Sequence, residues 1–313
     1  MVMLGASPDS HQSQSPVEFT LNDFFSRLVL LSLHHLTYID PNTNYAIIRV
    51  DNPTNITVAA TVEPGIRCVK ITTKDAYPIG SLAVIDVWHI PYGCSVRLAF
   101  ILDARHRPPL AKFRRNYIIE AINNLDSNQY ALHTTSECFL GTNSIHSGSI
   151  LQTYFSTGAG LAEVCLRRSL DVSGIYVWFR PRGSLPASIS QANSSSTINL
   201  TDWDTPTAAY LFNACNIAQY FQPQQLIIGI TLCSVWAGVP SIHNFTGCSG
   251  QCIDNVISTG NLIYNNASWD IAYTRSYLAT ATTTLTMGNA SVSPASKERF
   301  ISADRFQVFI VNW

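Results

Sequence analysis

Short runs rich in Val, Ile, Tyr and Trp recur along the chain, and this pattern restricts the possible fold more than any other feature. They are "YAIIRVD", "CVKITT", "SLAVIDVWHI", "GIYVWFRP", "QQLIIGITLC" and "WDIAYTRSYL". Clusters of turn-forming residues such as "DPNTN" and "EPGI" separate them. No stretch of about fifteen residues repeats apolar positions with the 3.6-residue period of a helix. Many strands without intervening helices predict an all-β sandwich or barrel.

The polar ends of the chain suggest where this β-domain begins and stops. Residues 1–18 are polar and low in aromatic residues, which predicts a disordered N-terminal segment. Residues 279–313 begin with the Ser/Thr-rich "ATATTTLTMGNAS" and are expected to form a C-terminal tail. No internal repeat is visible between them. The boundaries therefore predict one domain over residues 19–278.

Charge and hydropathy exclude several classes of function. Only 12% of the residues are charged and the formal net charge is −1, so a nucleic-acid partner is not expected. No run approaches the roughly eighteen apolar residues that cross a membrane. The surface must instead consist of Ser, Thr, Asn and Gln, which is typical of extracellular proteins that handle sugars. We expect such a chain to act as a monomer.

Cysteines and glycosylation motifs favour a secreted or cell-wall location. The chain has eight cysteines without a C-x-x-C pair, which favours disulfides over a zinc site, and "CSGQC" (Cys248 to Cys252) is expected to hold disulfide ends. Six N-x-S/T motifs also occur, at Asn55, Asn193, Asn199, Asn244, Asn266 and Asn289. The polar start "MVMLGASPDSHQSQSP" does not have the form of a signal peptide.

Several longer segments occur together in an order that resembles a known enzyme family. They are "VKITTKDAYPIGSLAVIDVWHIPYGC", "IIEAINNLDSNQYALHTTSEC", "GIYVWFRPRGSLP", "QQLIIGITLCSVWAG" and "NNASWDIAYTRSY". This series resembles the fungal branch of family 16 glycoside hydrolases, the endo-β-1,3(4)-glucanases. The resemblance implies a concanavalin A-like jelly-roll β-sandwich, β-glucan as the partner, and no cofactor. Relatives can hold a structural calcium ion, but no ligand cluster in this sequence places one.

The resemblance also identifies the catalytic strand, which in this family reads Glu-x-Asp-x-x-Glu. A retaining glycosidase needs two carboxyl groups about 5–5.5 Å apart, one as nucleophile and one as acid/base. Strand alternation puts the sixth position on the opposite face from the first unless a bulge shifts the phase. Here "RNYIIE" puts Arg115 at the nucleophile position, Tyr117 at the middle Asp position and Glu120 at the acid/base position. Arginine has no lone pair to attack a sugar, so retaining hydrolysis is predicted to be impaired or lost.

Another carboxylate could in principle replace the missing nucleophile. Asp103, Asp126 and Glu137 are the nearest acidic residues in the sequence. We expect Asp103 in the loop before the catalytic strand, and Asp126 and Glu137 on either side of the next strand. None has a spacing that predicts a carboxylate opposite Glu120 on the same face.

Two further residues match the family's sugar cleft. His133 in "ALHTT" corresponds to a histidine that faces the cleft, and Trp236 in "SVWAG" corresponds to a tryptophan on which sugars stack. Without the resemblance, a backbone-bonded strand histidine and a core tryptophan would be the simpler interpretations. Trp88 and His89 are adjacent on an alternating strand, so we expect them on opposite faces with one of them buried.

Departures from the family pattern are concentrated between Cys94 and Tyr117. Arg97 and Ile101 stand where the family has tryptophans, and five of the 19 Lys and Arg residues lie between Arg105 and Arg115. This basic stretch is either a solvated loop or part of a cleft for an anionic glycan. Three hypotheses for the whole chain follow: an impaired glucanase, a non-catalytic β-glucan-binding protein, and a mis-spliced or decaying copy of an active enzyme.

Overall fold

A computed structural model of the 313-residue chain describes most of the predicted β-domain. The described residues are 36–52, 67–104, 115–133, 145–148, 153–154, 164–171, 173–192, 198, 200, 203–211, 216–257, 264–278, 299–300 and 306–312. The predicted N-terminal segment, Glu137 and the basic stretch 105–114 lie outside these residues.

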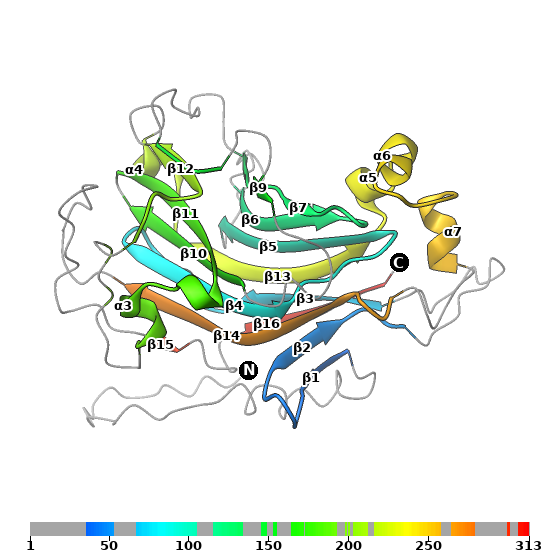
Figure 1. Ribbon diagram of the computed structural model, residues 1–313, viewed down its shortest axis with the longest axis horizontal. Helices are drawn as coiled ribbons and strands as arrows, with labels where there is room; N and C mark the ends of the chain where they lie inside the picture. Colours follow the sequence, from blue (N-terminus) through cyan, green and yellow to red (C-terminus); the bar gives the residue numbers. More distant parts are fainter. Residues whose placement is uncertain are drawn as a thin grey trace, which may run out of the picture.

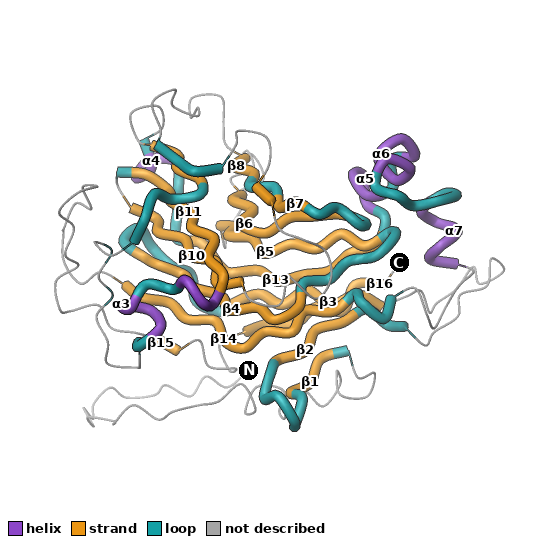
Figure 2. The backbone as a smooth tube through the Cα atoms, in the orientation of Figure 1, coloured by secondary structure: helices purple, strands orange, loops and turns teal. Residues whose placement is uncertain are grey.

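Two antiparallel sheets form the body of the molecule (Figures 1 and 2). The larger has the order β1 (Thr37–Ile39), β2 (Ala46–Arg49), β14 (Ser268–Leu278), β4 (Ser81–His89), β10 (Val164–Asp171), β11 (Gly174–Pro181) and β12 (Ala208–Leu211), with β15 (Arg299–Phe300) beside β14. The smaller has the order β16 (Phe306–Asn312), β3 (Arg67–Thr73), β13 (Gln224–Leu232), β5 (Val96–Ala104), β6 (Arg115–Ile122) and β8 (Ala131–His133). The prediction of an all-β sandwich is confirmed.

Alternation along β5 shows why this sequence forms a strand between the core and solvent. Val96, Leu98, Phe100 and Leu102 are buried in the core between the sheets. The residues between them point to the other side of the smaller sheet, which we call the pocket face. Burying apolar side chains on one face is the main favourable contribution to such a sandwich. The two-residue period of β5 therefore fixes which side chains the pocket face displays.

The last strand corrects the predicted domain boundary. Phe306–Asn312 forms β16 and pairs with β3 along its whole length, from Phe306 opposite Thr73 to Asn312 opposite Arg67. The apolar sequence "FQVFIVN" thus covers the edge of the smaller sheet instead of belonging to a tail. A polar segment before it had suggested that the domain stops at Leu278. The domain extends beyond that residue because β16 pairs with backbone groups of β3 that would otherwise form an open edge.

Short helices form a lobe at one end of β5 and β13 (Figure 1). The lobe contains α5 (Ser234–Ala237), α6 (Pro240–Phe245) and α7 (Cys252–Ile257). Disulfides Cys94–Cys248 and Cys233–Cys252 hold it, which confirms that both ends of "CSGQC" are disulfide-bonded. The other short helical turns are η2 (Arg182–Ser184), α3 (Ala187–Ser190) and α4 (Ile217–Tyr220). Within the described residues, no helix is long and apolar enough to span a membrane.

The prediction that one of Trp88 and His89 is buried is wrong. Both are partly exposed. The register between β4 and β14 shifts at this point: Asp270 pairs with His89 and the next residue, Ile271, pairs with Val87. Trp88 therefore lies between two consecutive pairs. A bulge of this kind breaks the two-residue alternation. Trp88 stacks on Tyr45, while His89 bonds through Nδ1 to the carbonyl of Ser268.

Candidate functional site

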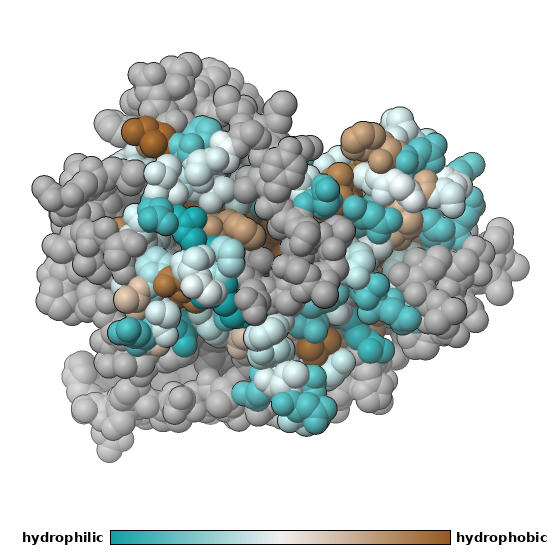
Figure 3. Space-filling model, viewed as in Figure 1, coloured by the Kyte–Doolittle hydropathy of each residue, from teal (hydrophilic) through white to brown (hydrophobic). Residues whose placement is uncertain are grey.

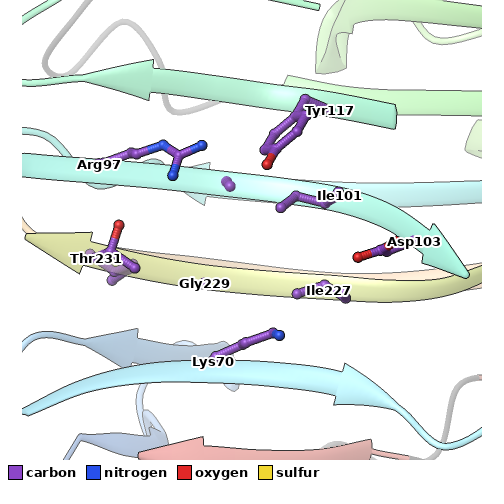
Figure 4. Close-up of a pocket in the computed structure, with 10 residues that line it drawn as sticks. Lys70, Arg97, Ile101, Asp103, Tyr117, Ile227, Gly229 and Thr231 are labelled. Carbon is purple, nitrogen blue, oxygen red and sulfur yellow. The ribbon is translucent and has the colours of Figure 1, made fainter. Parts of the chain in front are cut away.

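A pocket of about 140 Å³ opens on the pocket face of the smaller sheet (Figure 4). Its floor is made of small and apolar residues of β5 and β13, namely Ala99, Ile101, Ile227 and Gly229. Polar groups surround that floor, and their side chains are drawn around it in Figure 4: Lys70, Arg97, Asp103, Tyr117 and Thr231. The pocket is therefore an apolar surface with a rim of hydrogen-bonding groups.

A bulge in β6 brings the predicted acid/base residue to the same side as this pocket. Phe100 pairs with Ile119, but the next residue of β5, Ile101, pairs with Tyr117. Ile118 is left between these pairs, and both isoleucines are buried in the core. Glu120 pairs with Ala99, which lines the pocket, so Glu120 shares a face with Tyr117. The phase shift that the catalytic spacing requires is present.

Asn128 holds the bulge in place. Its side chain is buried, accepts a hydrogen bond from the backbone N–H of Glu120 at 2.9 Å, and donates one to the carbonyl of Ile118 at 2.9 Å. It thus satisfies two backbone groups that the irregular ladder leaves without strand partners. Nothing in the sequence motif alone identified this residue.

Replacing Asn128 with Ala is expected to lower the free energy of unfolding by about 1–3 kcal/mol, because both backbone groups would remain buried without partners. Urea denaturation measures the change. Asn124→Ala is the matched control, since Asn124 is exposed and, within the described residues, its side chain donates only to the sulfurs of Cys94 and Cys248. Equal losses for the two variants would contradict a specific role of Asn128.

Glu120 is held in an ion pair with Arg97. The guanidinium Nη2 of Arg97 donates to Oε1 of Glu120 at 2.6 Å, and only 7% of the Glu120 side chain is exposed. Burial alone would lower the pKa of Arg97, but the hydrogen bond and the charge of Glu120 raise the pKa above its usual value. Arg97 also lies over the ring of Tyr117, 5.7 Å from its centroid. The carboxylate is thus occupied by a fixed cation.

The other two positions of the catalytic motif also lie on this strand. Arg115 pairs with Asp103 of β5 on one side and with His133 of β8 on the other. Tyr117 is buried, and its ring meets that of His133 edge-on with centroids 5.4 Å apart. Glu120, Arg115 and Tyr117 therefore share β6, with His133 on the neighbouring strand β8, and Tyr117 is the one of these four that lines the pocket.

Asp103 is not in a loop, so that expectation is wrong. It is buried, belongs to β5, lines the pocket and sits directly opposite Arg115. Ala99, which pairs with Glu120, and Asp103 are four residues apart on β5, so they lie on the same face of the strand. Asp103 therefore shares the pocket face with Glu120. However, Asp103 lies on the strand next to the one that carries the nucleophile position, and neighbouring strands are about 4.8 Å apart. Its side chain is also one methylene shorter than that of glutamate. We therefore do not expect Asp103 to supply the pair separation that retaining hydrolysis needs.

Trp236 is not part of the pocket. It lies in α5 of the helical lobe and is partly exposed, whereas the pocket lining on β13 ends at Thr231. Asp126 is exposed in the turn that follows β6. No group of three or more metal-ligating side chains occurs within the described residues, so a structural calcium ion stays an expectation from the resemblance.

Comparison with known proteins gives a consistent result. Residues 32–165 and 164–277 match a family model described as an XgeA-like, catalytic GH16 domain. A probable endo-1,3(4)-β-glucanase of Aspergillus niger is 26% identical over 284 residues, 82% of this chain and 36% of that protein. A probable glycosidase of Schizosaccharomyces pombe is 26% identical over 75% of this chain and 60% of its own length. The chain thus spans less than two thirds of either relative.

The fold is also similar to a solved structure of laminarinase 16A from Phanerochaete chrysosporium, with 6-O-glucosyl-laminaritriose in its donor and acceptor sites. The two are 29% identical, the match covers 79% of this chain and 87% of that one, and the TM-score is 0.67. This similarity confirms the predicted jelly-roll sandwich.

Proposed function

The chain belongs to glycoside hydrolase family 16, in its XgeA-like group, and on that basis we propose that it binds β-1,3(4)-glucan on the pocket face without hydrolysing it. The observation that carries this proposal is the ion pair between Glu120 and Arg97 at 2.6 Å. It occupies the acid/base position on a strand whose nucleophile and middle positions hold Arg115 and Tyr117.

The lining of the pocket supports a neutral sugar as ligand. Ala99 and Gly229 leave an open, largely apolar floor against which the C–H face of a pyranose ring can lie. The hydroxyls of Tyr117 and Thr231 can donate hydrogen bonds to sugar hydroxyls and accept them, and the carboxylate of Asp103 can accept them. At about 140 Å³ the pocket is smaller than the roughly 300–1,000 Å³ of sites for drug-sized ligands. A single glucosyl unit of a longer chain suits that size.

The loss of hydrolysis follows from three substitutions that act on the same step. Arg115 provides no nucleophile, Tyr117 provides no second carboxylate, and Arg97 keeps Glu120 in a salt bridge. A general acid must give its proton to the leaving oxygen in the transition state. The Glu120 oxygen that accepts from the guanidinium of Arg97 is directed at that cation and not at a leaving oxygen.

The packing of β5 supports a genuine divergence over a mis-spliced window. The sequence "VRLAFILDA" lies inside the stretch that departs from the family, yet its four apolar residues Val96, Leu98, Phe100 and Leu102 all enter the core. Its outward residues complete the pocket. A wrongly translated segment has no reason to satisfy both faces of a central strand.

We also propose that the protein acts outside the cell, in the medium or at the cell wall. Its two described disulfides, one closing a chain separation of 154 residues, support an oxidising compartment. The glucanase relatives from fungi are consistent with this location.

Filling the pocket is expected to abolish glucan binding while the fold persists. A Cβ atom at Gly229 would meet neighbouring backbone only at 3.8 Å or more, so Gly229→Val fits the strand and fills the floor. Calorimetric titration with a soluble β-1,3-glucan should show at least a ten-fold weaker Kd, which is about 1.4 kcal/mol. Gly183→Val is the matched control, because no atom lies within 4 Å of its Cβ position and Gly183 belongs to η2, outside the pocket lining. Unchanged affinity in Gly229→Val, or no binding by the unmodified protein, would refute the proposal.

A further inference from the structure

A second pocket, of about 190 Å³, lies on the outer face of the larger sheet. Residues of β1, β2 and β14 line it, and Ile48 and Trp269 on the alternate positions of β2 and β14 are buried in the core. Its lining is mostly polar and includes Asp40, Arg49 and Asp270. Figure 3 shows hydrophilic side chains over the turn between β1 and β2, which borders this region. The glucan site described above makes no use of it.

The charged groups of this pocket are arranged around a space instead of being paired. Arg49 forms no ion pair within the described part of the chain, although two carboxylates line the same pocket. Asp40 accepts hydrogen bonds from the backbone N–H of Asn42 at 2.9 Å and the hydroxyl of Thr43 at 3.0 Å, and these bonds lower its pKa. Asp270 accepts one from Ser268 at 3.0 Å. Acceptors and a donor thus face a common space.

This set of groups selects a neutral, hydroxyl-rich ligand. One guanidinium against two carboxylates leaves a net negative charge, which disfavours an anion. A divalent cation is also disfavoured, because Arg49 lines the same space and only two carboxylates are there to oppose its charge. A sugar carries hydroxyl groups that both donate and accept, so it can bond to Asp270 and Arg49 at once.

A glycosylation motif lies directly at the pocket. Asn266-Ala267-Ser268 is an N-x-S motif, and Asn266 is exposed in the turn that leads into β14. Its neighbour Asn265 and the Ser268 of the same motif both line the pocket. The side chain of Asn265 accepts a hydrogen bond from Asn52 at 2.6 Å, which fixes one wall. A sugar attached to Asn266 therefore starts at the rim of a pocket suited to a sugar.

We propose that Asn266 carries an N-linked glycan whose first N-acetylglucosamine folds back into this pocket, against Arg49 and Asp270. The glycan then acts as a covalently attached part of the larger sheet's outer surface. This modification is independent of glucan binding, which uses the opposite sheet.

The test uses the full chain secreted from a eukaryotic host. Mass spectrometry of glycopeptides is expected to find Asn266 occupied. Asn266→Gln is expected to lower Tm by about 2–4 °C, as for a small loss of stability in a domain of this size. Trimming the folded protein with an endoglycosidase that leaves one N-acetylglucosamine should preserve Tm, because the first sugar makes the contacts.

Arg49→Met separates a sugar in the pocket from a glycan that merely projects into solvent. The variant should lower Tm in the glycosylated protein and have a smaller effect when combined with Asn266→Gln. Asn244→Gln is the matched control, since Asn244 is an exposed N-x-T residue in α6, outside the pocket, and its effect should add to that of Arg49→Met. An unoccupied Asn266, or simple additivity of Arg49→Met with Asn266→Gln, would overturn the proposal. Laminarin binding should be unchanged throughout.

Discussion

Combining Arg97→Trp, Arg115→Glu and Tyr117→Asp is expected to create the laminarin hydrolysis that we propose the unmodified protein lacks. The triple variant restores both missing acids and releases Glu120 from its ion pair with Arg97. Arg115→Glu with Tyr117→Asp alone should stay near background, because Glu120 would still be held by the guanidinium. General acid catalysis contributes about 10²- to 10⁴-fold to such reactions, so we expect a rate difference of that order between the triple and double variants.

Release of reducing sugar measures this prediction, and a fourth substitution controls it. Adding Glu120→Gln to the triple variant should remove the new activity, since the amide cannot donate a proton in the same way. A double variant that is already fully active would show that Arg97 does not block Glu120. A triple variant that folds, binds laminarin and stays inactive would show that the bulged strand does not present the three positions in catalytic geometry.

The same ion pair is expected to contribute strongly to stability. Removing one partner of a fully buried pair costs about 3–5 kcal/mol, and we expect about 2–3 kcal/mol here because the Arg97 side chain is 25% exposed. Arg97→Met or Glu120→Leu alone leaves an uncompensated charge, whereas the double variant leaves none. The double variant should therefore be more stable than the sum of the single losses predicts.

Urea denaturation of the four proteins in this cycle gives the coupling energy. Arg180 and Asp204 provide a matched surface pair, with N–O distance 3.1 Å and the Asp204 side chain 80% exposed. Exposed pairs contribute about 0.2–1 kcal/mol, so their coupling should be clearly smaller. Equal coupling in both cycles would contradict the assignment of Glu120 to a buried, fixed salt bridge.

Strand patterns predicted the sandwich because burial on one face imposes a two-residue period that is visible in the sequence. The same period could have placed Asp103 correctly. Continuing the alternation of Val96, Leu98 and Phe100 reaches Leu102 and makes Asp103 an outward residue of the strand. The neighbouring proline-rich, basic stretch favours a loop that already includes Asp103, whereas the strand continues to Ala104.

Other parts of the site could not be found in this way because they depend on contacts across the chain. Asn128 bonds to Glu120 and Ile118 only once the bulge exists. Arg97 of β5 forms its ion pair with Glu120 of the neighbouring strand β6. The bulges at Ile118 and Trp88 have no local composition that distinguishes them from regular strand. The C-terminal strand β16 was missed because a polar segment separates it from the rest of the domain, whereas pairing with β3 is set by the folded sheet.

Proton NMR of a β-1,3-glucan oligosaccharide incubated with the unmodified protein tests the central claim most directly, because one sample reports binding and hydrolysis. We predict that ligand signals broaden at once, that Gly229→Val abolishes the broadening, and that no new reducing-end anomeric signals appear over a day. New anomeric signals that grow with the amount of protein would contradict the loss of hydrolysis. Sharp, unchanged ligand signals would contradict glucan binding.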